Sequence, residues 1–228
     1  ALPIFQVMPV FFVVGGFANL RSLEAGGGRD VGAFLATRAE RLLRPTVLFA
    51  GIWLVLGPVL VAVWEEPRLA TDVARIAAQP LWFLAVYLLV VLAAPVQRRL
   101  HRRHGALLLV ALVAVVVGLD VLRISTVASG VAVANYLAVF LFCQELGFLY
   151  ADGRFAAVAP RRAALVGVGA LGALAVLTSA GPYPVSMIGL PGQRLSNMSP
   201  PTVVILVLGV AQASLLLAAH GPMSRWLR

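Results

Sequence analysis

Seven long runs of apolar residues are the feature that most limits what this chain of 228 residues can fold into. A helix that crosses a bilayer needs about 20 mostly apolar residues, because the hydrocarbon core is about 30 Å thick. The seven runs reach or approach this length. We therefore predict an all-α fold, a polytopic membrane helix bundle with about seven transmembrane helices. The predicted helices cover approximately Leu2–Leu20, Pro45–Trp64, Pro80–Val96, Gly105–Leu122, Val131–Ala151, Ala163–Ala180 and Pro201–His220.

The composition excludes an ordinary soluble domain. Hydrophobic residues make up 61% of the chain and charged residues 12%, whereas soluble domains hold about 45–50% and about 25%. Cys143 is the single cysteine, which rules out an intrachain disulfide framework. Because no long linker or fixed-period repeat divides the sequence, we expect one integral membrane domain over residues 1–228.

The 18 basic residues are all arginine, and they lie mainly in alternate loops. Fourteen follow the first, third, fifth and seventh apolar runs, and four lie in the other loops. Because cytoplasmic loops are enriched in arginine, we predict a multi-pass protein of the plasma membrane with Ala1 outside and Arg228 in the cytoplasm. The arginines are spread over separate loops, so we expect membrane lipid as a partner and no nucleic acid.

The predicted external start of the first helix leads to an expectation about the extent of the chain. A helix that starts outside, with no signal sequence before it, has no evident route of insertion. We therefore expect at least one further helix before Ala1 in the parent protein, and further helices after Arg228 are an open alternative.

The segment Asp30–Pro45 is predicted to be a cytoplasmic helix, with Asp30 as its N-cap and Pro45 as the break before the next span. At about 100° per residue, Arg38 falls in the middle of an apolar stripe. A charge in such a place needs an anionic partner or a wet cavity, because burying it unpaired is costly. The stripe consists of Val31, Phe34, Leu35, Ala39 and Leu42.

Two further arginines follow on the same predicted helix. Arg41 lies at the edge of the stripe, three residues after Arg38, so that both guanidinium groups can hold one phosphate or pyrophosphate. Arg44 points the other way and has Glu40 four residues before it as a helix-surface partner. The alternative interpretation is that all three arginines mark the cytoplasmic side and contact lipid headgroups.

Four short motifs, in order, resemble those of the acyltransferase-3 family of integral membrane acyltransferases, particularly its actinobacterial branch. The segment Pro9–Phe17 resembles the family's FFxxSGF motif, with Gly15 where serine is usual. Residues Arg38–Pro45 are similar to the RxxR motif that is followed by a hydrophobic pair and proline. Residues Gln79–Leu84 match the LWFL segment of the family, and Gly181–Pro201 looks like the external loop of the actinobacterial branch.

The resemblance implies transfer of an acyl group, commonly acetyl, from cytoplasmic acyl-coenzyme A to a hydroxyl of an extracytoplasmic glycan, lipid or small molecule of the cell envelope. In the family, the RxxR arginines hold the phosphates of the donor, a role that carries over to Arg38 and Arg41. We include the adjacent Arg44 in the predicted donor site. The resemblance implies no metal.

The catalytic histidine of the family lies on the helix that precedes the FFxxSGF helix, and this sequence does not include that helix. The implied chemistry therefore belongs to the parent protein, and this chain by itself is expected to lack the catalytic histidine. We expect His101 and His104 to lie in a basic cytoplasmic loop, where neither replaces it.

Two acidic residues lie within or near the spans. Glu145 lies about six residues inside the fifth run, where it pairs with Arg38, accepts a proton in catalysis or makes a structural bond between helices; the sequence leaves these alternatives open. Asp120 lies near an external end, and we expect a surface ion pair with Arg123.

The external loop Gly181–Pro200 is rich in proline, hydroxyl and amide groups. Such groups can bind the hydroxyls of an acceptor, although a covering loop without a ligand is an equal alternative. The predicted acceptor-binding residues are Tyr183, Arg194, Ser196 and Asn197.

Two other functions remain open from the sequence. One is a transporter or flippase, in which Arg38, Arg41 and Glu145 line the route of an anionic substrate. The other is a membrane subunit without chemistry of its own.

Overall fold

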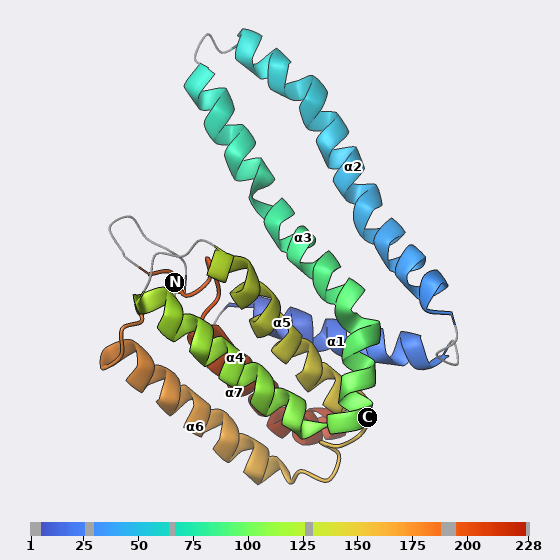
Figure 1. The fold of residues 1–228 in the computed structure, drawn as a ribbon, viewed down its shortest axis with the longest axis vertical. Helices are drawn as coiled ribbons and strands as arrows, with labels where there is room; N and C mark the ends of the chain where they lie inside the picture. The colour runs from blue at the N-terminus through green and yellow to red at the C-terminus, as the bar shows by residue number, and fades with distance from the viewer. Residues whose placement is uncertain (1–5, 26–29, 64–66, 126–129, 188–194, 227–228) are drawn as a thin grey trace. The chain divides into compact units, whose positions relative to one another are not determined.

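The computed structural model describes residues 6–25, 30–63, 67–125, 130–187 and 195–226, and these residues form seven α-helices with no strand among them (Figure 1). This confirms the predicted all-α fold. The helices are α1 (Met8–Ala25), α2 (Val31–Val63), α3 (Pro67–His104), α4 (Ala106–Ser125), α5 (Gly130–Ala151), α6 (Pro160–Ser179) and α7 (Val203–Trp226).

Most of these helices have the length and composition of membrane spans. Among the described residues, five segments are long and apolar enough to cross a bilayer, whereas Val203–Ala219 of α7 is apolar but shorter. The first helix carries Arg21 and Glu24 and is not among the five. The prediction of a membrane helix bundle is therefore confirmed. The five segments are Val31–Ala62, Leu81–His104, Ala106–Ser125, Ala132–Ala151 and Pro160–Ser179.

The predicted break at Pro45 is wrong, because α2 continues through this residue and through Pro58. Proline removes one helical hydrogen bond, but membrane helices tolerate it where hydroxyl side chains bond to nearby backbone groups. Pro45 offers no N–H to the Arg41 carbonyl, and the Thr46 hydroxyl adds a bond to the next carbonyl, that of Leu42, over 2.8 Å. The continuous helix has 33 residues and is about 50 Å long, well beyond the roughly 30 Å of a hydrocarbon core.

The third helix is also longer than predicted. It begins at Pro67, contains Pro80 and Pro95, and ends at His104. The stretch 97–104 was expected to be loop, so the prediction that His101 lies in a loop is wrong. Arginine and histidine are favourable in the last turn of a helix, where they face the negative end of its dipole.

The chain divides into two compact units, which we describe separately. The first contains residues 1–22 and 94–228, and the second contains residues 23–93. Within the first unit α6 packs along α7, α4 packs along α5, and both α4 and α5 contact α7. Because α3 contributes to both units, the division does not test the prediction of one domain.

Glycines bring α1 and α5 into backbone contact in the first unit. A Cβ atom on Gly16 would overlap the carbonyl oxygen of Gln144, and one on Gly147 would overlap the carbonyl oxygen of Val13. Small residues permit such close approach in membrane bundles, where apolar burial alone does not drive helices together. This crossing places the polar residues of α1 beside those of α5.

We predict that Gly147→Ala separates α1 from α5 and lowers the free energy of unfolding by about 1–3 kcal/mol, the usual cost of overpacking. Denaturant or thermal unfolding in detergent measures the change. Gly169→Ala is the matched control, because an added Cβ there meets nothing within 4 Å. Equal stability of the two variants would contradict the predicted crossing.

Candidate functional site

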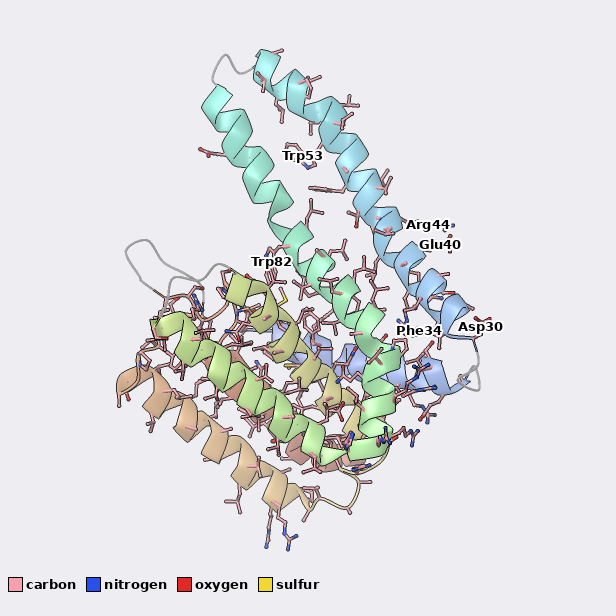
Figure 2. The ribbon with its side chains drawn as sticks, in the orientation of Figure 1. Asp30, Phe34, Glu40, Arg44, Trp53 and Trp82 are labelled. Atoms are coloured by element: carbon pink, nitrogen blue, oxygen red, sulfur yellow. The ribbon has the colours of Figure 1, made fainter. Side chains whose placement is uncertain are left out.

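The arginine-bearing part of α2 begins at a defined cap. The backbone N–H of Ala33 donates to Asp30 Oδ1 over 2.7 Å, and the N–H of Phe34 donates to the Asp30 carbonyl over 3.2 Å. Asp30 is thus the N-cap, as the sequence predicts. Because the cap fixes the first turn, it also determines on which face of α2 each following arginine lies (Figure 2).

The three arginines of α2 have different surroundings. Arg38 is half-buried, and its guanidinium carbon lies 5.8 Å from the centre of the Phe34 ring. Its charge also acts on the hydroxyl of Tyr87 in α3. Arg41 is exposed, and Arg44 is exposed and paired with Glu40. This burial pattern agrees with the face expected for each arginine.

A chain of buried hydrogen bonds in the first unit ends on Glu145. Asn19 Nδ2 donates to Gln144 Oε1 over 2.8 Å, and Gln144 Nε2 donates to Gln97 Oε1 over 2.8 Å. Gln97 Nε2 then donates to Glu145 Oε2 over 2.9 Å and also to the carbonyl of Leu141 over 2.9 Å. The chain connects α1, α5 and α3.

The same carboxylate contacts a histidine. His101 Nδ1 lies 2.5 Å from Glu145 Oε1, and His101 Nε2 lies 2.9 Å from Asp152 Oδ2. Both His101 and Glu145 are fully buried. Glu145 therefore makes the bond between helices that was one of its alternatives, while its role in catalysis and its pairing with Arg38 stay predictions.

Sequence reasoning missed His101, although a signal was available. Val90, Ala94, Gln97 and His101 are all buried, and their spacing of four, three and four residues is that of one helix face. Extending the apolar stripe of α3 past Pro95 would have placed His101 on this face.

A second buried carboxylate, that of Asp120, lies near the C-terminal end of α4. Asp120 accepts hydrogen bonds from Asn135 Nδ2 over 2.7 Å, from the Tyr183 hydroxyl over 3.0 Å and from the backbone N–H of Val203 over 2.8 Å. The expected surface ion pair with Arg123 is therefore wrong. Asp120 is buried, and it stabilises the first turn of α7, where a negative charge is favoured.

The tyrosine of this cluster is held in its neutral form. Burial raises the pKa of the Tyr183 hydroxyl well above its usual range, and the charge of Asp120 raises it further. A neutral hydroxyl is a donor, as the bond to Asp120 requires.

The other predicted acceptor residues shape the same loop. The Asn197 amide donates to the carbonyls of Pro184, over 2.5 Å, and Ser186, over 3.0 Å. The Ser196 hydroxyl accepts the backbone N–H groups of residues 198 and 199. Arg194 lies outside the described residues. Binding of an acceptor by Tyr183, Arg194, Ser196 and Asn197 stays a prediction.

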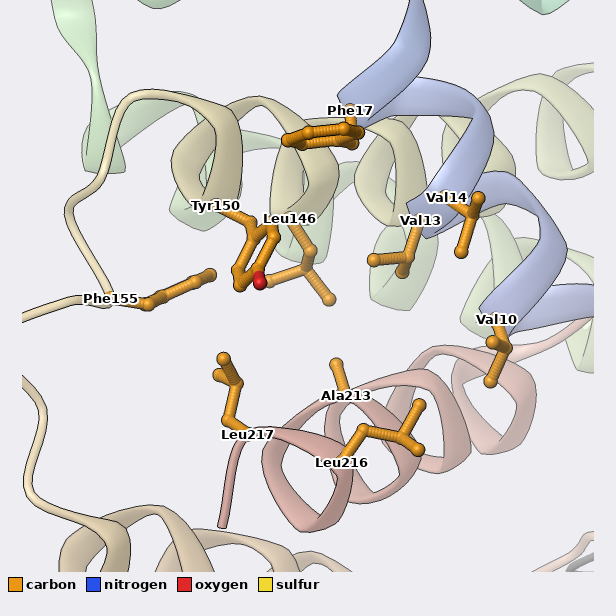
Figure 3. A pocket seen from close by; sticks show the side chains of 10 residues that line it. All are labelled: Val10, Val13, Val14, Phe17, Leu146, Tyr150, Phe155, Ala213, Leu216 and Leu217. Carbon is orange, nitrogen blue, oxygen red and sulfur yellow. The ribbon is translucent and has the colours of Figure 1, made fainter. Parts of the chain in front are cut away.

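An apolar pocket of about 290 Å³ lies between α1, α5, α7 and the turn that follows α5 (Figure 3). Tyr150 is the one lining residue with a polar side-chain group, and none of the lining residues is charged. The pocket can therefore hold hydrocarbon but not phosphate groups. It is lined by Val10, Val13, Val14, Phe17, Leu146, Tyr150, Phe155, Ala213, Leu216 and Leu217.

We predict that Tyr183→Phe lowers the free energy of unfolding by about 1.5–3 kcal/mol, the usual worth of a hydrogen bond to a charged group. Tyr150→Phe is the control, because its hydroxyl borders the open pocket, and a change within about 0.5 kcal/mol is expected. Thermal unfolding in detergent measures both variants. A smaller loss for Tyr183→Phe than for the control would show that the Asp120 cluster does not hold the loop.

Comparison with known proteins identifies the family. A family model described as an acyltransferase domain, of the acyltransferase-3 type, matches residues 4–227, nearly the whole chain. No curated protein and no solved structure matches. Because the match covers far more than half of the sequence, and the helices have the character of membrane spans, the chain belongs to the acyltransferase-3 family and is a membrane acyltransferase.

Proposed function

We propose that this membrane acyltransferase takes an acyl group, commonly acetyl, from cytoplasmic acyl-coenzyme A and transfers it to a hydroxyl of an extracytoplasmic glycan, lipid or small molecule. The observation that carries the proposal is the pair Arg38 and Arg41 on one long helix of a protein in this family. Coenzyme A is rich in phosphate, and a guanidinium group binds phosphate through two parallel hydrogen bonds.

The surroundings of the two arginines suit them to different parts of the donor. Arg38 is half-buried beside Phe34, so its guanidinium group is held in place and partly shielded from water. Arg41 is exposed three residues later, on a neighbouring face of α2. Arg44 is paired with Glu40 on the outer side of the helix (Figure 2), so we expect it to contribute less.

The orientation forms part of the proposal, with the plasma membrane as the location, Ala1 outside and Arg228 in the cytoplasm. Its support is that an arginine from the last turn of α3 and one from the turn after α5 meet at one end of the first unit. Arg102 Nη2 lies 3.6 Å from Asp152 Oδ1, and Arg154 Nε lies 4.0 Å from Asp152 Oδ2. This is the end at which α3 and α5 finish, as alternation of the spans requires.

The reaction balances without a further reactant. The acceptor hydroxyl oxygen bonds to the thioester carbonyl carbon, the carbon–sulfur bond breaks, and the hydroxyl proton ends on the coenzyme A sulfur. A base must take the proton first. In the described state one Glu145 oxygen accepts from Gln97 and the other contacts His101, so Glu145 could take this proton only after one of these contacts opens.

We predict that Arg38→Ala weakens binding of acetyl-coenzyme A by about 10- to 100-fold, because charge-assisted hydrogen bonds are worth about 1.5–3 kcal/mol. Arg38→Lys keeps the charge but loses the planar pair of N–H donors, so an intermediate loss of affinity is expected. Calorimetry on protein in lipid nanodiscs measures the dissociation constants. The matched control is Arg44→Ala, on the same helix, with less than about a 3-fold loss. Unchanged affinity of Arg38→Ala would remove Arg38 from the donor site.

We predict that the native membrane protein releases free coenzyme A thiol from acetyl-coenzyme A only when a hydroxyl acceptor is supplied. A thiol-reactive dye measures the release, and mass spectrometry measures the acylated acceptor. A transporter or a non-catalytic subunit would give no thiol above the rate without protein. That result would overturn the proposed reaction.

A further inference from the structure

We infer that His101, Glu145 and Asp152 form a buried proton-binding site. The site holds two protons, one more than a neutral histidine between two ionised carboxylates would carry. The inference concerns the protonation of the bundle and does not depend on the proposed reaction. It rests on hydrogen bonds that all lie within the first unit of the chain.

The geometry at the imidazole ring requires the additional proton. Nδ1 faces a Glu145 oxygen at 2.5 Å, and Nε2 faces an Asp152 oxygen at 2.9 Å. A neutral imidazole has one N–H donor, whereas an ionised carboxylate only accepts. With a single proton, one of the two contacts would join two acceptors inside the protein. Two protons satisfy both contacts, whichever atom of the short Nδ1–Oε1 contact holds the second one.

The amide chain assigns this proton to the histidine. The Gln97 amide nitrogen faces two acceptors, the Leu141 carbonyl and Glu145 Oε2, so this amide cannot be flipped without facing oxygen to oxygen. Its oxygen then accepts from Gln144, and the oxygen of Gln144 accepts from Asn19. All three amides thus donate in the direction of Glu145. Successive bonds polarise one another and favour the ionised carboxylate, which makes His101 an imidazolium ion.

The groups around the imidazole ring allow proton exchange with solvent from one side only. Glu145 and His101 are fully buried, but the side chain of Asp152 is 12% exposed. Arg102 and Arg154 approach Asp152 within 3.6 Å and 4.0 Å, and both side chains are about half exposed. The proton therefore enters and leaves through Asp152. When it leaves, the Asp152 contact opens before the shorter, deeper contact with Glu145.

A spectroscopic experiment tests the site without relying on catalysis. Protein with ¹⁵N-labelled histidine in lipid nanodiscs is followed from about pH 5 to about pH 9, a range that brackets the ordinary histidine pKa of about 6.5. We expect both ring nitrogens of His101 to keep their protons at pH 8. Free ¹⁵N-labelled histidine in the same buffers is the control, and its ring signals change with pH across this range. The variant His101→Gln assigns the His101 signals.

A substitution at the partly exposed Asp152 gives a second test of the site. Asp152→Asn removes one carboxylate and keeps the shape of the side chain, so we expect His101 to appear at pH 8 as a neutral ring with one protonated nitrogen. The inference is overturned if wild-type His101 is neutral at pH 6, or if its signals change over the same pH range as those of free histidine. It is also overturned if His101 in the Asp152→Asn protein stays doubly protonated at pH 8.

Discussion

A buried carboxylate, Glu145, determines which polar groups must meet in the middle of this bundle. A charge in an apolar interior is tolerated only when hydrogen-bond donors surround it, because its desolvation costs several kcal/mol. The donors come from His101 and Gln97, and through Gln144 from Asn19. Apolar faces alone leave helices free to slide in lipid, which is as apolar as they are. The carboxylate therefore fixes the registers of α1, α3 and α5.

The glycine contact makes this arrangement possible. An asparagine side chain is short, and Asn19 reaches Gln144 only because the α1 backbone lies directly on α5 at Gly16 and Gly147. A larger residue at either glycine would move Asn19 away and leave the end of the amide chain without its donor. The FFxxSGF-like segment of α1 thus has a packing role that its sequence similarity alone does not explain. The close backbone contact and the alignment of the polar residues of α1 with those of α5 therefore depend on each other.

The sequence was sufficient where local periodicity decides the structure, and insufficient where distant partners do. The seven helices, the Asp30 cap and the face of Arg38 follow from patterns within a few turns. The break expected at Pro45 is wrong because α2 continues through this residue, and proline interrupts membrane helices less often than soluble ones. Asp120 was expected on the surface because Arg123 is near in sequence, but its real partners lie 15, 63 and 83 residues away.

Burial distinguishes the arginine that suits the proposed donor site from those that serve the fold. Arg102 and Arg154 flank Asp152, and Arg44 is paired with Glu40, so the nearest acidic group accounts for the position of each. Arg38 differs from these three in its burial, because it lies beside an aromatic ring on a half-buried face of α2. A guanidinium group placed there loses part of its hydration, and a phosphate ligand restores more interaction energy than it would at an exposed arginine. Burial, rather than the motif alone, is thus the physical reason why we propose Arg38 as the first contact of the donor phosphates.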